Sequence, residues 1–467
     1  MRPEIAQIEQ SITRRMEARS LAPAVIEEFL RRVRLVNAGA SGKTAWSEIG
    51  DLGQSDYADM EQLAPPAADA LKQAAGQLAV VKLNGGLGTS MGLTQAKSLI
   101  AVRDNDSFLQ IIVRQIKALR ERYGGDVPLL FMNSINTQAD TLAVPGVIDM
   151  NREAGLPADF LQNMVPRIDQ ESLMPMGNGS EDSHWCPPGH GDVYLALQTT
   201  GLLDRLLEKG YRTLFLSNGD NLGATADARL LDYFTREKLE FMSEVTPKTL
   251  ADLKGGVLFR RTGGGAIELL ETAQVPDEHI KDFQDVERFA YFNINNLWAN
   301  LEALRDRLKA GSLDLSLIVN PKVVEDQPVL QLETAMGAAV GRFERTRVMI
   351  VPRRRFAPAK TCADLLVRRS DACELTDDLA LELSPKRTLG EPVVKLSDHY
   401  KKIRGFEELI PELPSLLDCK ELSVEGPVRF DQPVSIKGAV RIRTNSTDPV
   451  NISKLGQTEL VDGEFTL

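Results

Sequence analysis

Glycine, lysine and polar residues gather in a few short segments whose spacing suits the binding of phosphate groups. The segment Lys82–Gly92, KLNGGLGTSMG, holds four glycines and is followed by Lys97. Glycines let main-chain N–H groups approach a phosphate closely, and the ammonium of Lys97 is a natural phosphate partner. The spacing matches neither the Walker A loop nor the G-x-G-x-x-G fingerprint. A tight turn without a ligand, beside a solvated lysine, is the competing interpretation.

Two further segments present polar side chains at turns. Pro187–Asp192, PPGHGD, forms a rigid turn that presents His190, which can donate to a phosphate; a loop histidine with its own internal partner is the alternative. The apolar run Leu214–Leu216 delivers Asn218 and Asp220 at the end of an expected strand. Carboxylates that hold metals in nucleotide-binding α/β folds lie at such strand ends, although an Asx turn would look similar.

Two groups suit the other parts of a phosphorylated, hydroxyl-rich ligand. Glu271 and the asparagines of the segment 292–298, FNINNLW, combine carboxylate and carboxamide groups, which can pair with sugar hydroxyls. Strand-end turns are the alternative, because asparagine is common there. The segment 351–360, VPRRRFAPAK, places cations after an expected strand, where they could face phosphates or form a solvated basic loop.

The elements that must position these residues alternate between strands and helices. Short apolar runs with few polar interruptions are typical of strands buried on both faces, and amphipathic stretches between them predict helices. The predicted strands cover 78–81, 127–132, 213–216 and 347–351, and the predicted helices cover 108–123, 193–209 and 228–239. This alternation predicts an α/β sheet flanked by helices, with the ligand at the carboxyl ends of the strands.

The two ends of the chain differ from this central pattern. Residues 3–38 show helical spacing, and the Gly-, Ser-, Asp- and Pro-rich stretch 39–66 is typical of a linker or irregular arm. After an expected helical region over 396–417, short β-type runs with Gly426 and Gly438 favour stacked coils of a parallel β-helix. A small antiparallel sheet is the alternative.

Composition excludes several classes of function. The 467 residues carry a formal net charge of −11, opposite in sign to a protein that coats nucleic acid, so we expect no nucleic-acid partner. No apolar run is long enough for a membrane-spanning helix, and no export signal is recognised at the start. Four dispersed cysteines without a C-x-x-C pair favour reduced thiols and a cytoplasmic location.

Taken together, the segments resemble one family, the eukaryotic-type UTP–glucose-1-phosphate uridylyltransferases, also called UDP-glucose pyrophosphorylases. The resemblance covers most of the chain and rests on segments in the family's order: KLNGGLGTSMG, PPGHGD, SNGDNLGATAD, LLETAQVP, FNINNLW, QLETAMGAA and RRRFAPAKT. It implies a Rossmann-like (GT-A-like) α/β catalytic domain with a mixed sheet over residues 76–385, after an N-terminal helical portion over 1–75. A C-terminal domain with a left-handed parallel β-helix would cover 386–467.

The resemblance also implies roles for individual residues. The nucleotide-binding set comprises Leu83, Asn84, Gly85, Gly86, Lys97, Met132, Gln162, Pro188, Gly189, Asp220 and Lys360. The sugar-phosphate set comprises Gly86, His190, Asn218, Gly219, Gly256, Glu271, Asn293, Asn295 and Phe356. Lys97, Lys360 and Asp220 would be catalytic, and Asp220 would help to hold Mg²⁺.

The implied reaction joins UTP and glucose 1-phosphate to give UDP-glucose and pyrophosphate, in a homo-oligomer formed through the C-terminal domain. Two alternatives stay open at this point. One is a UDP-sugar pyrophosphorylase of broad specificity, and the other is a catalytically silent protein that senses UTP.

Overall fold

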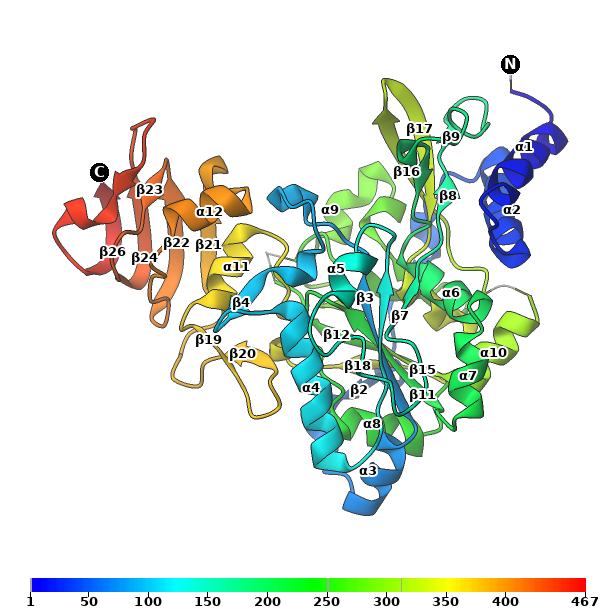
Figure 1. Ribbon diagram of the computed structural model, residues 1–467, viewed down its shortest axis with the longest axis horizontal. Helices are drawn as coiled ribbons and strands as arrows, with labels where there is room; N and C mark the ends of the chain where they lie inside the picture. The colour runs from blue at the N-terminus through cyan, green and yellow to red at the C-terminus, as the bar shows by residue number, and fades with distance from the viewer. Residues whose placement is uncertain (1, 250–251, 312) are drawn as a thin grey trace.

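A mixed eight-stranded sheet forms the centre of the computed structural model, which describes residues 2–249, 252–311 and 313–467 (Figure 1). The strands, in spatial order, are β2 (Tyr57–Asp59), β18 (Thr346–Ile350), β12 (Phe241–Pro247), β15 (Tyr291–Asn300), β11 (Thr213–Asn218), β3 (Leu78–Asn84), β6 (Leu129–Asn133) and β7 (Asp159–Leu161). Only β15 runs antiparallel to its neighbours β11 and β12 in this sheet. The predicted α/β architecture with a mixed sheet is confirmed.

Helices cover both faces of the sheet, as the apolar strand runs require. Leu78 and Val80 of β3 pack in one cluster, whereas Ala79 and Val81 pack in another, because successive strand residues point to opposite faces. The first cluster includes residues of α3 (Ala68–Ala75), α4 (Phe108–Tyr123) and α8 (Ala228–Arg236). The second includes residues of α6 (Val193–Thr199), α7 (Leu202–Glu208) and α10 (Leu301–Lys309).

Local sequence signals explain where two of these helices begin and end. Ser107 caps α4, since its hydroxyl accepts from the Gln110 N–H while its own N–H donates to Gln110 Oε1, and Gly124 ends the helix with φ +66°. The single helix predicted over 193–209 is two helices, because Gly201 between α6 and α7 adopts φ +70°.

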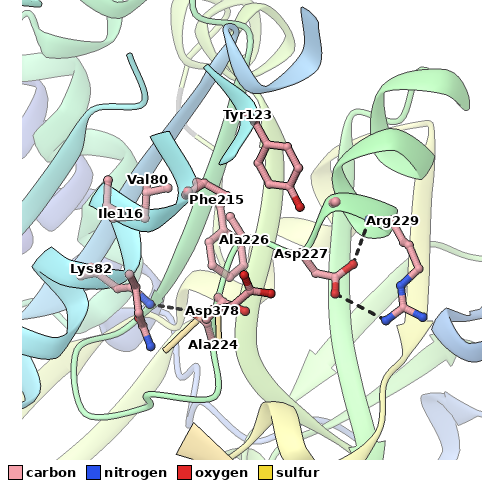
Figure 2. A pocket seen from close by; sticks show the side chains of 14 residues that line it. Val80, Lys82, Ile116, Tyr123, Phe215, Ala224, Ala226, Asp227, Arg229 and Asp378 are labelled. Carbon is pink, nitrogen blue, oxygen red and sulfur yellow. Dashed lines mark hydrogen bonds and ion pairs between the residues drawn. The ribbon is translucent and has the colours of Figure 1, made fainter. Parts of the chain in front are cut away.

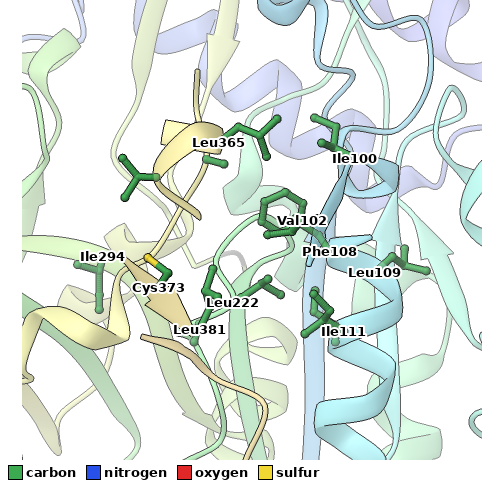
Figure 3. Packing of buried hydrophobic residues seen from close by; sticks show 14 of the residues in the cluster. Ile100, Val102, Phe108, Leu109, Ile111, Leu222, Ile294, Leu365, Cys373 and Leu381 are labelled. Atoms are coloured by element: carbon green, nitrogen blue, oxygen red, sulfur yellow. The ribbon is translucent and has the colours of Figure 1, made fainter. Parts of the chain in front are cut away.

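The cluster on the first face also supports the loop that follows β11. Figure 3 shows Leu222 of this loop among Phe108, Leu365 of α11 (Cys362–Arg369) and Leu381, and all four side chains are fully buried. A loop anchored in this way by an apolar side chain cannot shift without exposing that surface. The hydrophobic core thus holds in place the loop that carries Asn218 and Asp220.

The N-terminal region begins with two helices, as predicted, and continues into the central sheet. α1 (Ile5–Glu17) and α2 (Pro23–Asn37) bury Ile8, Ile12, Phe29 and Val33 in a separate cluster. The stretch 39–66 is more than a linker, because its strand β2 pairs in parallel with β18 through Tyr57 and Val348. The strand was missed because three residues give too short a pattern to recognise.

The C-terminal region lies to one side of the central sheet (Figure 1) and is built from parallel strands. β21 (Val393–Leu396), β22 (Cys419–Glu425), β24 (Ser435–Arg443) and β26 (Glu459–Thr466) pair in parallel throughout, which excludes the antiparallel alternative. β23 (Val428–Arg429) and β25 (Val450–Asn451) also pair in parallel. Of the helical region expected over 396–417, only a 3-10 turn at Asp398–Tyr400 and α12 (Ile403–Leu409) are helical.

Smaller elements complete the described chain. They are β1 (Ile49–Gly50), β4 (Ala101–Arg103), β5 (Asp106–Ser107), α5 (Gln138–Leu142), β8 (Val165–Pro166), β9 (Ile168–Asp169), β10 (Trp185–Cys186), β13 (Val257–Arg261), β14 (Ile267–Leu270), α9 (Ile280–Phe283), β16 (Ile318–Val324), β17 (Gln327–Glu333), β19 (Cys373–Leu375) and β20 (Leu381–Leu383). No helix of the described residues has the length and apolar character that crossing a membrane requires. The division into three parts at residues 75 and 385 stays a prediction.

Candidate active site

Several of the predicted residues lie along one edge of the central sheet. Leu83 of β3 pairs with both Asn218 of β11 and Met132 of β6, so the carboxyl ends of three parallel strands lie side by side. Because β15 is antiparallel, its beginning meets this same edge, and Asn293 there pairs with Val245 of β12. Ligands of α/β sheets bind outside this edge.

The Gly-rich loop lies against Gln162 and the turn at Gly189. A Cβ on Gly85 would be 3.1 Å from Gln162 Oε1, and Gln162 Nε2 donates to the carbonyl of Gly189 at 2.9 Å. Gly86 has open space where a Cβ would stand, and its carbonyl accepts from the Lys97 N–H at 3.2 Å. This part of the site therefore offers exposed main chain, as phosphate binding requires.

Two residues predicted to contact the nucleotide, Asn84 and Met132, have side chains that are buried within the protein. The side-chain amide of Asn84 donates to Asn133 Oδ1 at 2.9 Å and Thr141 Oγ1 at 2.7 Å, so its amide hydrogens are already used. Met132 is 2% exposed and packs in the apolar cluster on the second face. Both side chains are thus engaged within the protein rather than directed to the exposed loop.

The turn at Pro188–His190 is held by the segment that follows β17. Thr334 N–H donates to the Pro188 carbonyl at 3.0 Å, and Gly189 (φ +84°) has no room for a side chain because a Cβ would lie 2.4 Å from Thr334 O. His190 Nδ1 accepts from the Met336 N–H at 3.0 Å. Burial lowers the pKa of His190 to about 4. The imidazole is thus neutral near pH 7, and its hydrogen resides on Nε2, available to donate.

Lys97 and Asp220 form an ion pair between the Gly-rich loop and the loop after β11. Lys97 Nζ lies 2.6 Å from Asp220 Oδ2, and both side chains are about one-fifth exposed, at 18% and 22%. Gly219, next to Asp220, lies close to the end of β3, since its N–H donates to Leu83 O at 2.8 Å and a Cβ would lie 2.8 Å from the same oxygen. The pair places one cation and one carboxylate, both partly exposed, beside the Gly-rich loop.

Four of the predicted sugar-phosphate residues, Gly256, Glu271, Asn293 and Asn295, form a group around the start of β15. The Glu271 carboxylate lies against Gly256, where a Cβ would be 2.9 Å from Oε2, and Asn293 N–H donates to the Gly256 carbonyl at 2.8 Å. Asn293 Nδ2 donates to Oδ1 of Asn295, which has φ +57°, at 2.8 Å. Burial raises the pKa of Glu271, and the cation of Lys360 opposes that rise. The group offers both donors and acceptors, as hydroxyl groups require.

The basic segment after β18 divides into paired arginines and one exposed lysine. Arg353 makes a two-bond pair with Asp252, Arg354 lies near Glu61 and Glu382, and Arg355 pairs with Glu244. Among the described residues, no carboxylate lies within ion-pair distance of Lys360, whose Nζ is 5.7 Å from the centre of the Phe356 ring. The arginines therefore stabilise this segment, and Lys360 is the cation left to meet a ligand.

A cavity of about 120 Å³ lies away from these groups, between α4, β3 and the segment 224–229 (Figure 2). Lys82 borders it and donates to Ser217 Oγ and to the carbonyl of Ala224, both at 2.7 Å. Burial lowers the pKa of Lys82 to about 7. Lys82 was not singled out from the sequence, yet it ties together both ends of the loop that carries Asp220.

Among the described residues, the site offers a carboxylate for a metal ion but not a complete set of protein ligands. Within the described ranges, no group of three or more His, Cys, Asp or Glu side chains is arranged to hold a metal ion. Asp220 offers one carboxylate at the carboxyl edge of the sheet. Mg²⁺ is commonly held by one or two carboxylates together with water and substrate phosphates, so this donor set fits a cation that arrives with a nucleotide.

Main-chain donors for phosphates and paired donors and acceptors for hydroxyls thus border one edge of a mixed sheet. This combination defines the class of α/β proteins that bind nucleotides at the carboxyl ends of their strands. Comparison with known families makes the assignment specific. The sequence profile of the UTP–glucose-1-phosphate uridylyltransferases matches residues 26–437, and the chain belongs to this family of nucleotidyltransferases.

Individual relatives and solved structures agree with this membership. The chain is 42% identical to the UTP–glucose-1-phosphate uridylyltransferase of Solanum tuberosum over 90% of this chain and 88% of that one. It is 42% identical to the enzyme of Saccharomyces cerevisiae over 80% and 76%. A mutant UDP-glucose pyrophosphorylase of Leishmania major, solved in complex with UDP-glucose, has a TM-score of 0.91 at 37% identity and 100% coverage of both chains.

Proposed function

We propose that this chain transfers the uridylyl group of UTP to glucose 1-phosphate, giving UDP-glucose and pyrophosphate. The observation that carries this proposal is membership of the uridylyltransferase family over residues 26–437. The phosphate oxygen of glucose 1-phosphate attacks the α-phosphorus of UTP, and the bond between that phosphorus and the oxygen bridging to the β-phosphate breaks. Pyrophosphate carries away the electron pair. No protein nucleophile is required when the two oxygens lie in line.

The main task of the protein is to hold two polyanions close together. In our proposal, the main chain at Gly85 and Gly86 and the side chain of Gln162 bind UTP, with Leu83, Asn84, Met132, Pro188 and Gly189 forming its surroundings. Lys97 and Lys360 contact the reacting phosphates and stabilise the charge that develops on them. Lys360 is exposed and, among the described residues, has no carboxylate within ion-pair distance, although its charge acts on Glu271; this position supports the role.

Sugar recognition belongs to the group around β15. We propose that Glu271, Asn293 and Asn295 pair with the hydroxyls of glucose, and that His190 donates from Nε2 to its phosphate. The remaining predicted members of the sugar-phosphate set (Gly86, Asn218, Gly219, Gly256 and Phe356) would border the ligand. The neutral imidazole supports this donor role, because Nδ1 is already occupied by the Met336 N–H.

Asp220 would hold Mg²⁺, which would supply charge neutralisation at the phosphates. In our proposal, Lys97 exchanges its present contact with Asp220 Oδ2 for a contact with a phosphate. An exchange of one ionic partner for another leaves neither group without a counter-charge. The short Lys97–Asp220 contact supports this exchange, because each group already has a counter-charge before substrates arrive.

Three broader expectations remain proposals. The parallel pairing of β21, β22, β24 and β26 supports a C-terminal β-helix, which we propose to be left-handed. We propose that the protein forms homo-oligomers through this region. The four buried free thiols support a cytoplasmic location, where cysteines stay reduced.

The test is a pyrophosphate-release assay with UTP, Mg²⁺ and a panel of hexose 1-phosphates, in which each component is omitted in turn. We expect release that requires glucose 1-phosphate and clearly prefers it. Comparable kcat/KM values across several sugars would favour the enzyme of broad specificity. UTP binding without release under any condition would favour the silent sensor.

A further inference from the structure

The two loops that carry Asp220 and Lys360 come from distant parts of the chain and meet at one buried side chain. Asn221, next to Asp220, is 1% exposed. Its backbone forms an isolated antiparallel bridge with Pro358, two residues before Lys360. We propose that Asn221 is a positioning residue that fixes Lys360 relative to Asp220 during uridylyl transfer. This inference rests on the proposed roles of Asp220 and Lys360.

Asn221 uses both ends of its carboxamide to bind residues 355–360, called here the Lys360 segment. Oδ1 accepts from the Ala357 N–H at 2.8 Å, and Nδ2 donates to the Arg355 carbonyl at 3.1 Å. Oδ1 also accepts from the Gly223 N–H at 3.2 Å within its own loop. A carboxylate would lack the donor and a hydroxyl would lack the reach, so the geometry is specific to a carboxamide.

The Lys360 segment is immobilised on its other side by a buried ion pair. Arg355 binds Glu244 through two parallel hydrogen bonds of 2.7 and 2.8 Å, and the side chains are 4% and 0% exposed. A bidentate pair of this kind fixes orientation as well as distance. Asn221 therefore donates to the carbonyl of Arg355, a residue whose side chain is already bound to Glu244 of the central sheet.

The main chain of the loop after β11 packs directly against the main chain of the segment after β18, and we call this contact the junction. A Cβ on Gly223 would lie 2.4 Å from the Arg354 carbonyl oxygen, so the loop after β11 rests directly on the segment after β18. We therefore expect a displacement of one loop to move the other. Since misplacement of a reacting group by about 1 Å can cost about 100-fold in rate, this junction matters for kcat.

Asn221→Ala tests the inference, with Asn151→Ala as a matched control. Asn151 is also 1% exposed and makes three side-chain hydrogen bonds, to the main chain of Leu129 and Pro157, but it lies near the opposite end of β6. We expect Asn221→Ala to lower kcat by about 10- to 100-fold while the Kd for UTP, measured by calorimetry, changes less than about threefold. Asn151→Ala should lower the Tm without this loss of kcat.

A double-mutant cycle with Lys360→Ala separates positioning from a general structural effect. If Asn221 acts through Lys360, the loss of kcat caused by Asn221→Ala shrinks to less than about threefold in the Lys360→Ala background. Asn221→Ser, a milder change at the buried position, repeats the cycle should the alanine variant fold poorly. Equal losses in both backgrounds, or an unchanged kcat, would overturn the inference. An unchanged kcat in Lys360→Ala alone would instead refute the role proposed for Lys360.

Discussion

The buried Glu244 carboxylate offers a quantitative test of how the Lys360 segment is held. It accepts four hydrogen bonds, from Arg355 Nε and Nη2 at 2.7 and 2.8 Å, Asn296 Nδ2 at 3.0 Å and Trp298 Nε1 at 2.9 Å. Glu244→Gln keeps the shape of the side chain but replaces one carboxylate oxygen by an NH₂ group, which cannot accept from the donors that face it. About two of these bonds are lost, at about 1.5–3 kcal/mol each for bonds to charged groups, and the buried Arg355 loses the carboxylate with which it forms an ion pair. We expect a loss of about 3–5 kcal/mol in the free energy of unfolding.

Urea unfolding followed by circular dichroism measures this loss, provided that the transition is two-state. The Glu244→Gln/Arg355→Met double variant should recover much of the stability, because it removes the isolated charge as well. Glu408→Gln is the control, since its pair with Arg404 is exposed and should contribute no measurable stability. The reasoning is refuted if Glu244→Gln is as mild as Glu408→Gln, or if the double variant is less stable than the single one.

Three further predictions concern the proposed roles in catalysis and binding. Lys360→Ala should lower kcat by about 100-fold while calorimetry shows nearly unchanged UTP binding, since the lysine would act on charge that develops during transfer; a kcat within twofold of the unmodified enzyme would contradict this. Glu271→Ala should raise KM for glucose 1-phosphate and leave the Kd for UTP intact, and loss of UTP binding would speak against a sugar contact. Because burial lowers the pKa of His190 to about 4, unfolding binds a proton below about pH 6.5, so this residue's contribution to stability falls as the pH drops from about 6.5 to 4. Thermal unfolding across this range should show a smaller acid effect in His190→Gln, and identical pH profiles would show that the imidazole is not buried as a neutral group.

The central strands and helices could be predicted because local and tertiary signals agree there. β3, β6, β11 and β18 are apolar runs buried on both faces, and α4 carries a capping box at Ser107 and a terminal Gly124. In two other places the local sequence pattern was too weak to predict the element correctly. The three residues of β2 form a strand only because β18 offers a free edge, and a single glycine at position 201 divides a helix whose apolar pattern is continuous.

The motifs could be placed at strand ends from the sequence, whereas the partners of each side chain could not. The sequence predicted Asn218 and Asp220 at the end of a strand, and in the structure Asn218 pairs with Leu83 while Asp220 forms an ion pair with Lys97. No local pattern showed that Arg355 would turn inward to Glu244, more than 100 residues away, or that Asn84 would use its amide on Asn133. Such pairings depend on which strands become neighbours, and this information is spread over the whole chain.

The pairing of β2 with β18 has a consequence for how the protein is made on the ribosome. Tyr57 emerges early, but its sheet partner Val348 is translated almost 300 residues later, and Asn221 likewise waits for Ala357. Sheets that depend on such distant pairings form slowly. A nascent chain shorter than about 350 residues therefore exposes an unpaired strand edge and lacks the junction between the two loops. Translation of residues 346–360 supplies both the strand β18 and the segment that Asn221 binds.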